Sequence, residues 1–311
     1  MLLWGHPVSP GLGEIEMISS SRNRPRMDTV VVFWILALFA ITAIGALPLF
    51  FYRLDLSKLT FSTPIPVLVG IGIEITAYAP TLAALLVVAL VPGGGGIGRL
   101  VQPVVRWRIG FAWYLLALLG PSVLFLVGDV VRLGLGLALP PHWLVIPGAA
   151  AIAFLLGALI AGSFGEEVGW RGLGQPRLQA SCGALWAAIA VGVVWSVWHL
   201  WPIVAPGGLN NTTLSDVVLT LVRLIATSVV YAWIYNDTHG SLLIVMLAHA
   251  GHNLAVRFVP MADSVQHGDP IVATLYVVAA IVVVLATTSR WLSPLPRWSQ
   301  DSSKKVKPQN S

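Results

Sequence analysis

Eight long apolar segments, separated by short polar ones, constrain the fold of this chain more than any other feature of its sequence. A helix needs about 20 apolar residues to cross the ~30 Å hydrocarbon core of a bilayer. Each segment is close to that length, and lipid offers no partners for open backbone groups, so each is predicted to be a helix. The predicted spans cover residues 29–52, 66–91, 109–129, 143–164, 183–201, 215–235, 241–259 and 270–289.

The composition agrees with a polytopic all-α membrane bundle. Hydrophobic residues make up 57% of the chain and charged residues only 10%, whereas soluble proteins carry about 25% charged residues. The single cysteine, Cys182, excludes an intramolecular disulfide and a cysteine-rich metal cluster. The formal charge of +5 comes from residues that flank the apolar segments, so it predicts orientation in a bilayer and no nucleic-acid partner.

Lysine and arginine are richest before the first span, in the second and fourth loops, and after the last span. The positive-inside rule therefore predicts that both termini are cytoplasmic. We expect one transmembrane domain, residues 29–289, between a disordered N-terminal segment, residues 1–28, and a basic disordered cytoplasmic tail, residues 290–311. The excess of arginine over lysine suggests a GC-rich bacterial genome, and hence a bacterial cell membrane.

Ionisable residues inside spans are costly, and three short motifs contain most of them. The first motif, GEEVGWRG, covers residues 165–172. On a helix, Glu167 and Arg171 share a face and form a natural ion pair. Glu166 points about 100° away, which leaves it available for another partner. The alternative is a simple salt bridge at the end of a span.

The other two motifs supply histidines. WSVWH ends at His199 in the fifth span, where packing in an aromatic face is an alternative role. HAGHN, residues 249–253, lies in the seventh span. His249 and Asn253 are four residues apart and point into one site, and His252 lies about 40° from Asn253 around the helix. Interhelical polar packing is the alternative for this motif.

Together, these residues could activate a water molecule inside the membrane. Glu166 would accept its proton, and a histidine or Asn253 would stabilise the oxyanion of a tetrahedral intermediate. Glu166, His199 and His249 could instead hold a zinc ion with one open position, although the zinc-protease motif HExxH is absent. Because a fourth span that ended before Glu166 would separate it from His199, we expect the fourth helix to continue past Glu166.

The ordered motifs EExxxR, an aromatic residue with xxxH, and HxxxN resemble the CAAX protease and bacteriocin-processing (CPBP) family of intramembrane proteases, which includes type II CAAX prenyl endopeptidases. The resemblance implies a protease core over residues 143–260, with Glu166 and His199 activating water. It also implies that His249 and Asn253 bind the oxyanion or that His249 binds a metal, and that Glu167 and Arg171 support the site. Trp195 stands where the family commonly has Phe.

The predicted function is therefore an intramembrane endopeptidase that cleaves a membrane-associated protein or peptide from the cytoplasmic side, with zinc or with no cofactor. The alternative is a catalytically silent scaffold or bacteriocin-immunity protein of the same fold. A proton-coupled transporter that uses Glu74, Glu166 and Arg223 is a third possibility, although the sequence shows no internal repeat. For Glu74 and Arg223 we expect a structural pairing with each other or with Asp216.

Overall fold

Helices form all the regular secondary structure of the described residues, as the sequence predicts. The computed structural model describes residues 28–55, 58, 64–139, 143–145, 148, 150–208, 212–259, 268–289 and 292. Apart from Asp28 and Leu292, the segments predicted to be disordered lie outside the described residues.

Every predicted span coincides with helix. The helices of the first three spans are α1 (Thr29–Tyr52), the pair α2 (Val67–Ala77) and α3 (Ala79–Leu90), and α5 (Phe111–Gly134), which follows the short α4 (Ile97–Val101). The later ones are α6 (Ala150–Gly157), α7 (Gly165–Glu167) and α8 (Gln175–Cys182) in one run, α9 (Ala184–Trp198) with the short α10 (Trp201–Val204), α11 (Leu214–Asp237), α12 (Leu242–Phe258) and α13 (Pro270–Ala286).

These helices make the chain an integral membrane protein. Five helical runs are long and apolar enough to span a bilayer, and α2 with α3, bent by 65°, makes up to six. Helices α12 and α13 are apolar but have only 17 residues each. The prediction of helices is thus confirmed, while eight crossings and cytoplasmic termini stay predictions.

The fourth span lies further along the chain than predicted. Helix continues from Ala150 to Cys182 through two π-helical stretches, Ala158–Phe164 and Val168–Gly174. The predicted end at residue 164 was wrong because the charged motif that follows it is buried inside the bundle, where its carboxylates find partners. The expectation that this helix continues past Glu166 is confirmed. π-Helical stretches often occur at functional sites.

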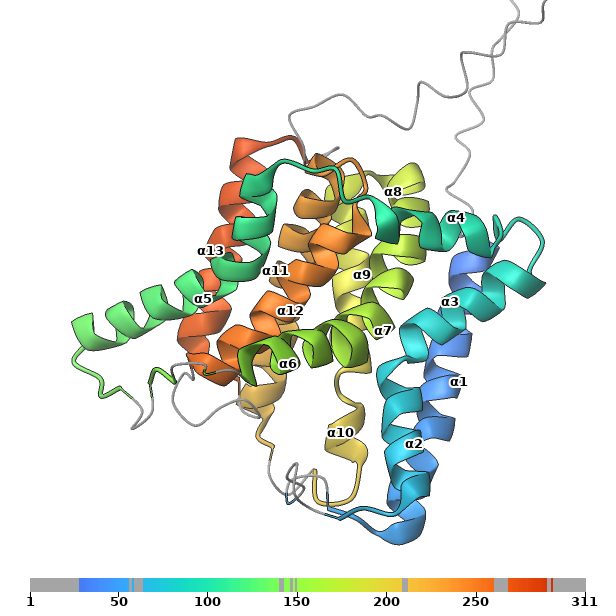
Figure 1. Cartoon of the computed structure of the whole chain (residues 1–311), viewed down its shortest axis with the longest axis horizontal. Coiled ribbons are helices and arrows are strands. Elements are labelled where there is room, and N and C mark those ends of the chain that lie inside the picture. The colour runs from blue at the N-terminus through green and yellow to red at the C-terminus, as the bar shows by residue number, and fades with distance from the viewer. Residues whose placement is uncertain are drawn as a thin grey trace, which may run out of the picture.

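Helices α11 and α12 occupy the middle of the bundle (Figure 1). Helix α12 packs against α5, α11 and the π-helical stretch Ala158–Phe164, and α11 packs against α9 and α13. Helices α1, α2 and α3 form a separate layer whose α3 rests on the helical run around α7 (Figure 1). The charged motif of residues 165–172 is therefore enclosed by several helices.

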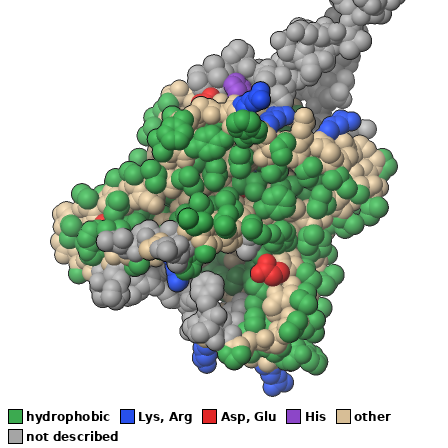
Figure 2. Space-filling model, viewed as in Figure 1, with side chains coloured by type: hydrophobic (Ala, Val, Ile, Leu, Met, Phe, Trp, Pro, Cys, Tyr) green, Lys and Arg blue, Asp and Glu red, His purple; other side chains and the backbone are tan. Residues whose placement is uncertain are grey.

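Hydrophobic side chains cover much of the face shown in Figure 2, and most of the Lys and Arg side chains visible there lie toward the top and bottom of the molecule. Arg177 binds the Asp28 carboxylate at 2.8 Å and the Gly94 carbonyl at 3.0 Å. These three residues belong to segments that are all predicted to be cytoplasmic. Arg132 and Asp269, from two segments predicted to be external, form an ion pair at 2.7 Å. These contacts fit the predicted alternation of the loops.

Candidate functional site

The motif at residues 165–172 is positioned by two glycines that share one helical face. A Cβ atom at Gly165 would lie 2.9 Å from the Ala77 carbonyl oxygen, and one at Gly169 would overlap the backbone of Pro80. Both contacts are at the bend between α2 and α3. The absence of side chains lets the helix lie directly on this bend, and the carboxylates of the motif project from its other faces.

Glu167 and Arg171 form the ion pair that their spacing predicts. The side chains of both residues are fully buried, and Arg171 NH1 lies 3.1 Å from Glu167 Oε2. Arg171 NH2 also donates to Ser228 Oγ on α11 at 3.0 Å. The hydroxyl of Ser228 donates in turn to the Ala188 carbonyl on α9 at 2.7 Å. The ion pair thus ties the fourth helical run to two other helices.

His249 on α12 lies between the two adjacent carboxylates. Its Nδ1 is 2.8 Å from Glu167 Oε1, and its Nε2 is 3.9 Å from Glu166 Oε1. The first distance is a hydrogen bond, and it fixes the orientation of the ring. The second is too long for a direct hydrogen bond and suits a bridging water molecule. His249 is 5% exposed, so bulk solvent barely reaches it.

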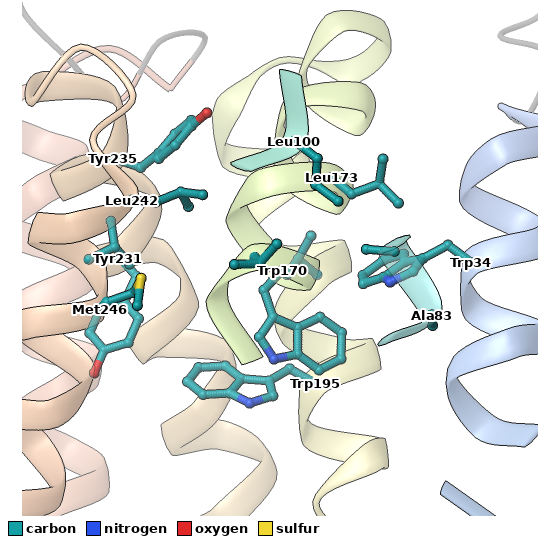
Figure 3. Close-up of a cluster of buried hydrophobic side chains, with 14 of the residues drawn as sticks. Trp34, Ala83, Leu100, Trp170, Leu173, Trp195, Tyr231, Tyr235, Leu242 and Met246 are labelled. Carbon is teal, nitrogen blue, oxygen red and sulfur yellow. The ribbon is translucent and has the colours of Figure 1, made fainter. Parts of the chain in front are cut away.

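Two indoles hold the other oxygen of Glu166. Trp195 Nε1 donates to Glu166 Oε2 at 2.6 Å, and Trp170 Nε1 donates to the same oxygen at 3.3 Å. In Figure 3 the rings of Trp170 and Trp195 lie next to each other, with Tyr231 on the neighbouring helix. Because both donors occupy Oε2, Oε1 is left to face His249.

Trp195 is the common wall of the site. Its ring centroid lies 5.6 Å from that of His199 and 5.7 Å from that of His249. The guanidinium carbon of Arg171 is 4.9 Å from the centroid of Trp195 and 5.2 Å from that of Tyr231. A cation over the faces of desolvated aromatic rings is stabilised by their quadrupoles. The rings therefore exclude water and also help to hold the buried charge.

The other predicted site residues lie near this cluster, but no hydrogen bond between described residues joins His199 or Asn253 to Glu166, Glu167 or His249. His199, at the C-terminal end of α9, has its Nδ1 3.2 Å from the Trp195 carbonyl oxygen. A carbonyl only accepts, so Nδ1 carries the proton and Nε2 keeps its lone pair in the neutral ring. Asn253 lies against the π-helical stretch Ala158–Phe164, since a Cβ atom at Gly162 would be 3.1 Å from its Nδ2.

His252 lies apart from the two glutamates. Its Nε2 is 3.2 Å from Arg223 NH1, and its Nδ1 is 2.6 Å from the Tyr276 hydroxyl oxygen. The expected pairing of Arg223 with Glu74 or Asp216 is therefore replaced by a contact with a histidine. Glu74 is exposed on α2, and Asp216 forms a capping box with Thr213 at the start of α11.

The zinc alternative requires its three predicted ligands to lie around one point in the structure. Nowhere in the described part of the chain are three His, Cys, Asp or Glu side chains grouped so that they could hold a metal ion. His199 is separated from Glu166 by the Trp195 indole. In this arrangement Glu166, His199 and His249 are not grouped as the ligands of one zinc ion would be.

A comparison with protein-family models adds independent information about this region. Residues 147–255 match the family described as Type II CAAX prenyl endopeptidase Rce1-like. This segment is an Rce1-like domain. It belongs to the CPBP family of intramembrane proteases and contains Glu166, Glu167, His199, His249 and Asn253. None of the curated proteins compared with the chain matches it.

Several residues that contact the buried charges could not be identified from the sequence. Trp170, Ser228 and Tyr231 contact the charged groups directly, yet each reads as an ordinary residue of an apolar helix. Trp195 was expected only as an aromatic residue at the position where the family commonly has Phe. A weak signal exists for Tyr231, because it follows Ser228 by three residues and therefore lies on a similar face of α11.

Proposed function

We propose that the chain is an intramembrane endopeptidase that hydrolyses peptide bonds of a membrane-associated protein or peptide. The observation that carries this proposal is the position of His249, whose Nδ1 binds Glu167 while its Nε2 faces Glu166 Oε1 across 3.9 Å. The Rce1-like match over residues 147–255 supports the same reaction class.

The charges of the buried groups indicate how His249 acts. The proposed reaction needs an ionised Glu166, and Glu167 forms an ion pair with Arg171. A water-excluded cluster is most stable when its charges balance, and a second positive charge on His249 balances them. Both ring nitrogens then donate, Nδ1 to Glu167 and Nε2 into the space beside Glu166.

In the proposed reaction a water molecule and the scissile carbonyl approach Glu166 Oε1 and His249 Nε2, which lie 3.9 Å apart. Glu166 Oε1 removes a proton from the water as the water oxygen attacks the carbonyl carbon. The His249 Nε2–H, with the Asn253 amide, stabilises the oxyanion that forms. Glu166 then returns the proton to the leaving amine as the C–N bond breaks. His199 assists the approach of water through its free Nε2.

The first test compares the wild-type chain with Glu166→Gln in membranes of cells that produce each protein at matched levels. Newly formed peptide N-termini would be labelled and quantified by mass spectrometry. Glutamine keeps the shape of the side chain and both indole contacts can persist, but it cannot accept the proton. Fragments found with the wild type and absent with Glu166→Gln are the expected result.

Glu74→Gln is the matched control, because Glu74 is exposed on α2 and belongs to no part of the proposed site. It should leave the fragments unchanged. Identical profiles for wild type and Glu166→Gln, with the biological effect of the protein intact, would favour the catalytically silent scaffold. Equal loss of that effect in both variants, without any change of fragments, would favour a proton relay.

A further inference from the structure

Arg223 is a charged residue inside a predicted span, and it has no role in the proposed reaction. It lies on α11 and is partly exposed. Three other arginines of the bundle, Arg132, Arg171 and Arg177, each form an ion pair with a carboxylate. Arg223 takes part in none of the ion pairs between described residues. An uncompensated cation at this depth is costly, and such residues usually serve a function.

The contacts of Arg223 orient its side chain without neutralising it. Its NH1 lies 3.2 Å from His252 Nε2, and a guanidinium can only donate. Nε2 therefore accepts, and the proton of the neutral ring sits on Nδ1, which donates to the Tyr276 hydroxyl at 2.6 Å. Phe125 packs edge-on against the same imidazole at 5.7 Å. A rigid, neutral acceptor thus holds one nitrogen of Arg223 in place.

The position of this cation relative to the proposed site is defined by α12. His252 follows His249 by three residues, a rise of about 4.5 Å along the helix, and Asn253 comes next. Arg223 therefore lies about one helical turn along α12 from His249, on the side of Asn253, which is proposed to stabilise the oxyanion.

We propose that Arg223 binds a carboxylate of the substrate close to the scissile bond. A guanidinium presents two parallel N–H donors that match a carboxylate, and an interaction of this kind excludes neutral peptides. The carboxylate is either the C-terminus of a substrate that is cleaved near its end or an Asp or Glu side chain. This inference rests on the proposed function, because only a protease has a scissile bond. The predicted binding of a carboxylate can nevertheless be measured without cleavage.

The experiment measures peptide capture by the full chain carrying Glu166→Gln, purified in detergent micelles. Three libraries of random octapeptides serve as probes: free acids without Asp or Glu, C-terminal amides without Asp or Glu, and amides with one internal Asp or Glu. Captured peptides are quantified by mass spectrometry. We expect one of the two carboxylate libraries to be enriched about tenfold or more over the neutral amides.

Arg223→Gln in the same background should reduce this enrichment to nearly one, and Arg223→Lys should keep part of it. Arg257→Gln, which removes an exposed arginine of α12, should change nothing. A thermal unfolding curve for each variant separates loss of recognition from loss of fold, and if Arg223→Gln does not fold, Arg223→Lys alone decides. Equal capture of all three libraries would overturn the inference. So would an enrichment that is as large in Arg223→Gln, or in Arg223→Lys where only that variant folds, as it is with Arg223.

Enrichment of the free acids assigns the C-terminal carboxylate, and enrichment of the internal Asp or Glu library assigns a side chain. A failure of the proposed function looks different from a failure of this inference. Cleavage absent from the wild type, with carboxylate capture that depends on Arg223, would leave a carboxylate-binding site in a protein that is not a protease.

Discussion

Replacing Glu167 by glutamine should destabilise the bundle strongly, because Glu167 is the carboxylate to which both Arg171 and His249 are bound. It lies 3.1 Å from Arg171 NH1 and 2.8 Å from His249 Nδ1, and it is fully buried. Glutamine keeps one acceptor oxygen but turns an amino group toward the other donor. Arg171, also fully buried, then has no negative charge beside it.

The magnitude follows from the uncompensated charge. Removing one partner of a buried ion pair costs about 3–5 kcal/mol. The rings of Trp195 and Tyr231 still face Arg171 and offset part of that loss, so we expect a decrease of about 3 kcal/mol in the free energy of unfolding. The double variant Glu167→Gln/Arg171→Gln removes the stranded charge. It should therefore be less destabilised than the sum of the single variants, with a coupling of about 1–3 kcal/mol.

Unfolding would be followed by tryptophan fluorescence as SDS is added to the protein in mixed micelles. Glu74→Gln, at an exposed position of α2, should stay within about 0.5 kcal/mol of the wild type. A loss below about 1 kcal/mol for Glu167→Gln, or single-variant effects that add within about 0.5 kcal/mol, would refute the reasoning. Either result would mean that the cluster is more hydrated than its burial implies.

Trp195→Phe should lower the cleavage rate about tenfold, because it removes a hydrogen bond to a charged group. Such a bond contributes ~1.5 kcal/mol, which corresponds to about a factor of ten in rate. Trp170→Phe should lower it less, because its indole is 3.3 Å from Glu166 while that of Trp195 is 2.6 Å away; the reverse order in the measured rates would contradict this geometry. Cleavage should persist when a membrane-permeant zinc chelator is added, whereas a loss restored by zinc would establish the metal alternative. Gly169→Ala should reduce the free energy of unfolding by about 1–3 kcal/mol because its Cβ overlaps Pro80. Gly157→Ala in the same helical run meets no atom within 4 Å and should not destabilise the protein in the same unfolding assay.

The sequence correctly predicts features that depend on residues close together in the same helix. The apolar segments predict the helices, and the spacing of Glu167 and Arg171 predicts their ion pair. The continuation of the fourth helix past Glu166 also follows, because Glu166 and His199 have to be at similar depth. The exact end of that helix does not follow from hydropathy, since a buried polar motif resembles a loop.

The sequence does not predict which side chains of different helices contact one another. Helical periodicity indicates that His249 and Asn253 share a face, but it cannot tell which residues of another helix they meet. The structure puts His249 on Glu167 and leaves Asn253 beside Gly162. The indole donors of Glu166 and the contact between Arg223 and His252 depend in the same way on the packing of separate helices.

The different environments of Glu166 and Glu167 allow a protease to be distinguished from a catalytically silent scaffold of the same fold. Glu167 is hydrogen-bonded to a cation and a histidine, so it contributes to stability, whereas the hydrogen bonds of Glu166 to other described residues come only from two neutral indoles. Its charge is costly in a buried position, and a neutral glutamine would accept the same indole donors. Without that charge His249 can lose its second proton and still donate from Nδ1 to Glu167, so the charges of the cluster stay balanced. Glu166→Gln should therefore leave the free energy of unfolding unchanged or raise it by about 1 kcal/mol while it abolishes cleavage, a trade-off typical of catalytic residues. The SDS titration used for Glu167 measures this directly, and a destabilisation as large as that of Glu167→Gln would mean that Glu166 has a structural role and would favour the silent scaffold.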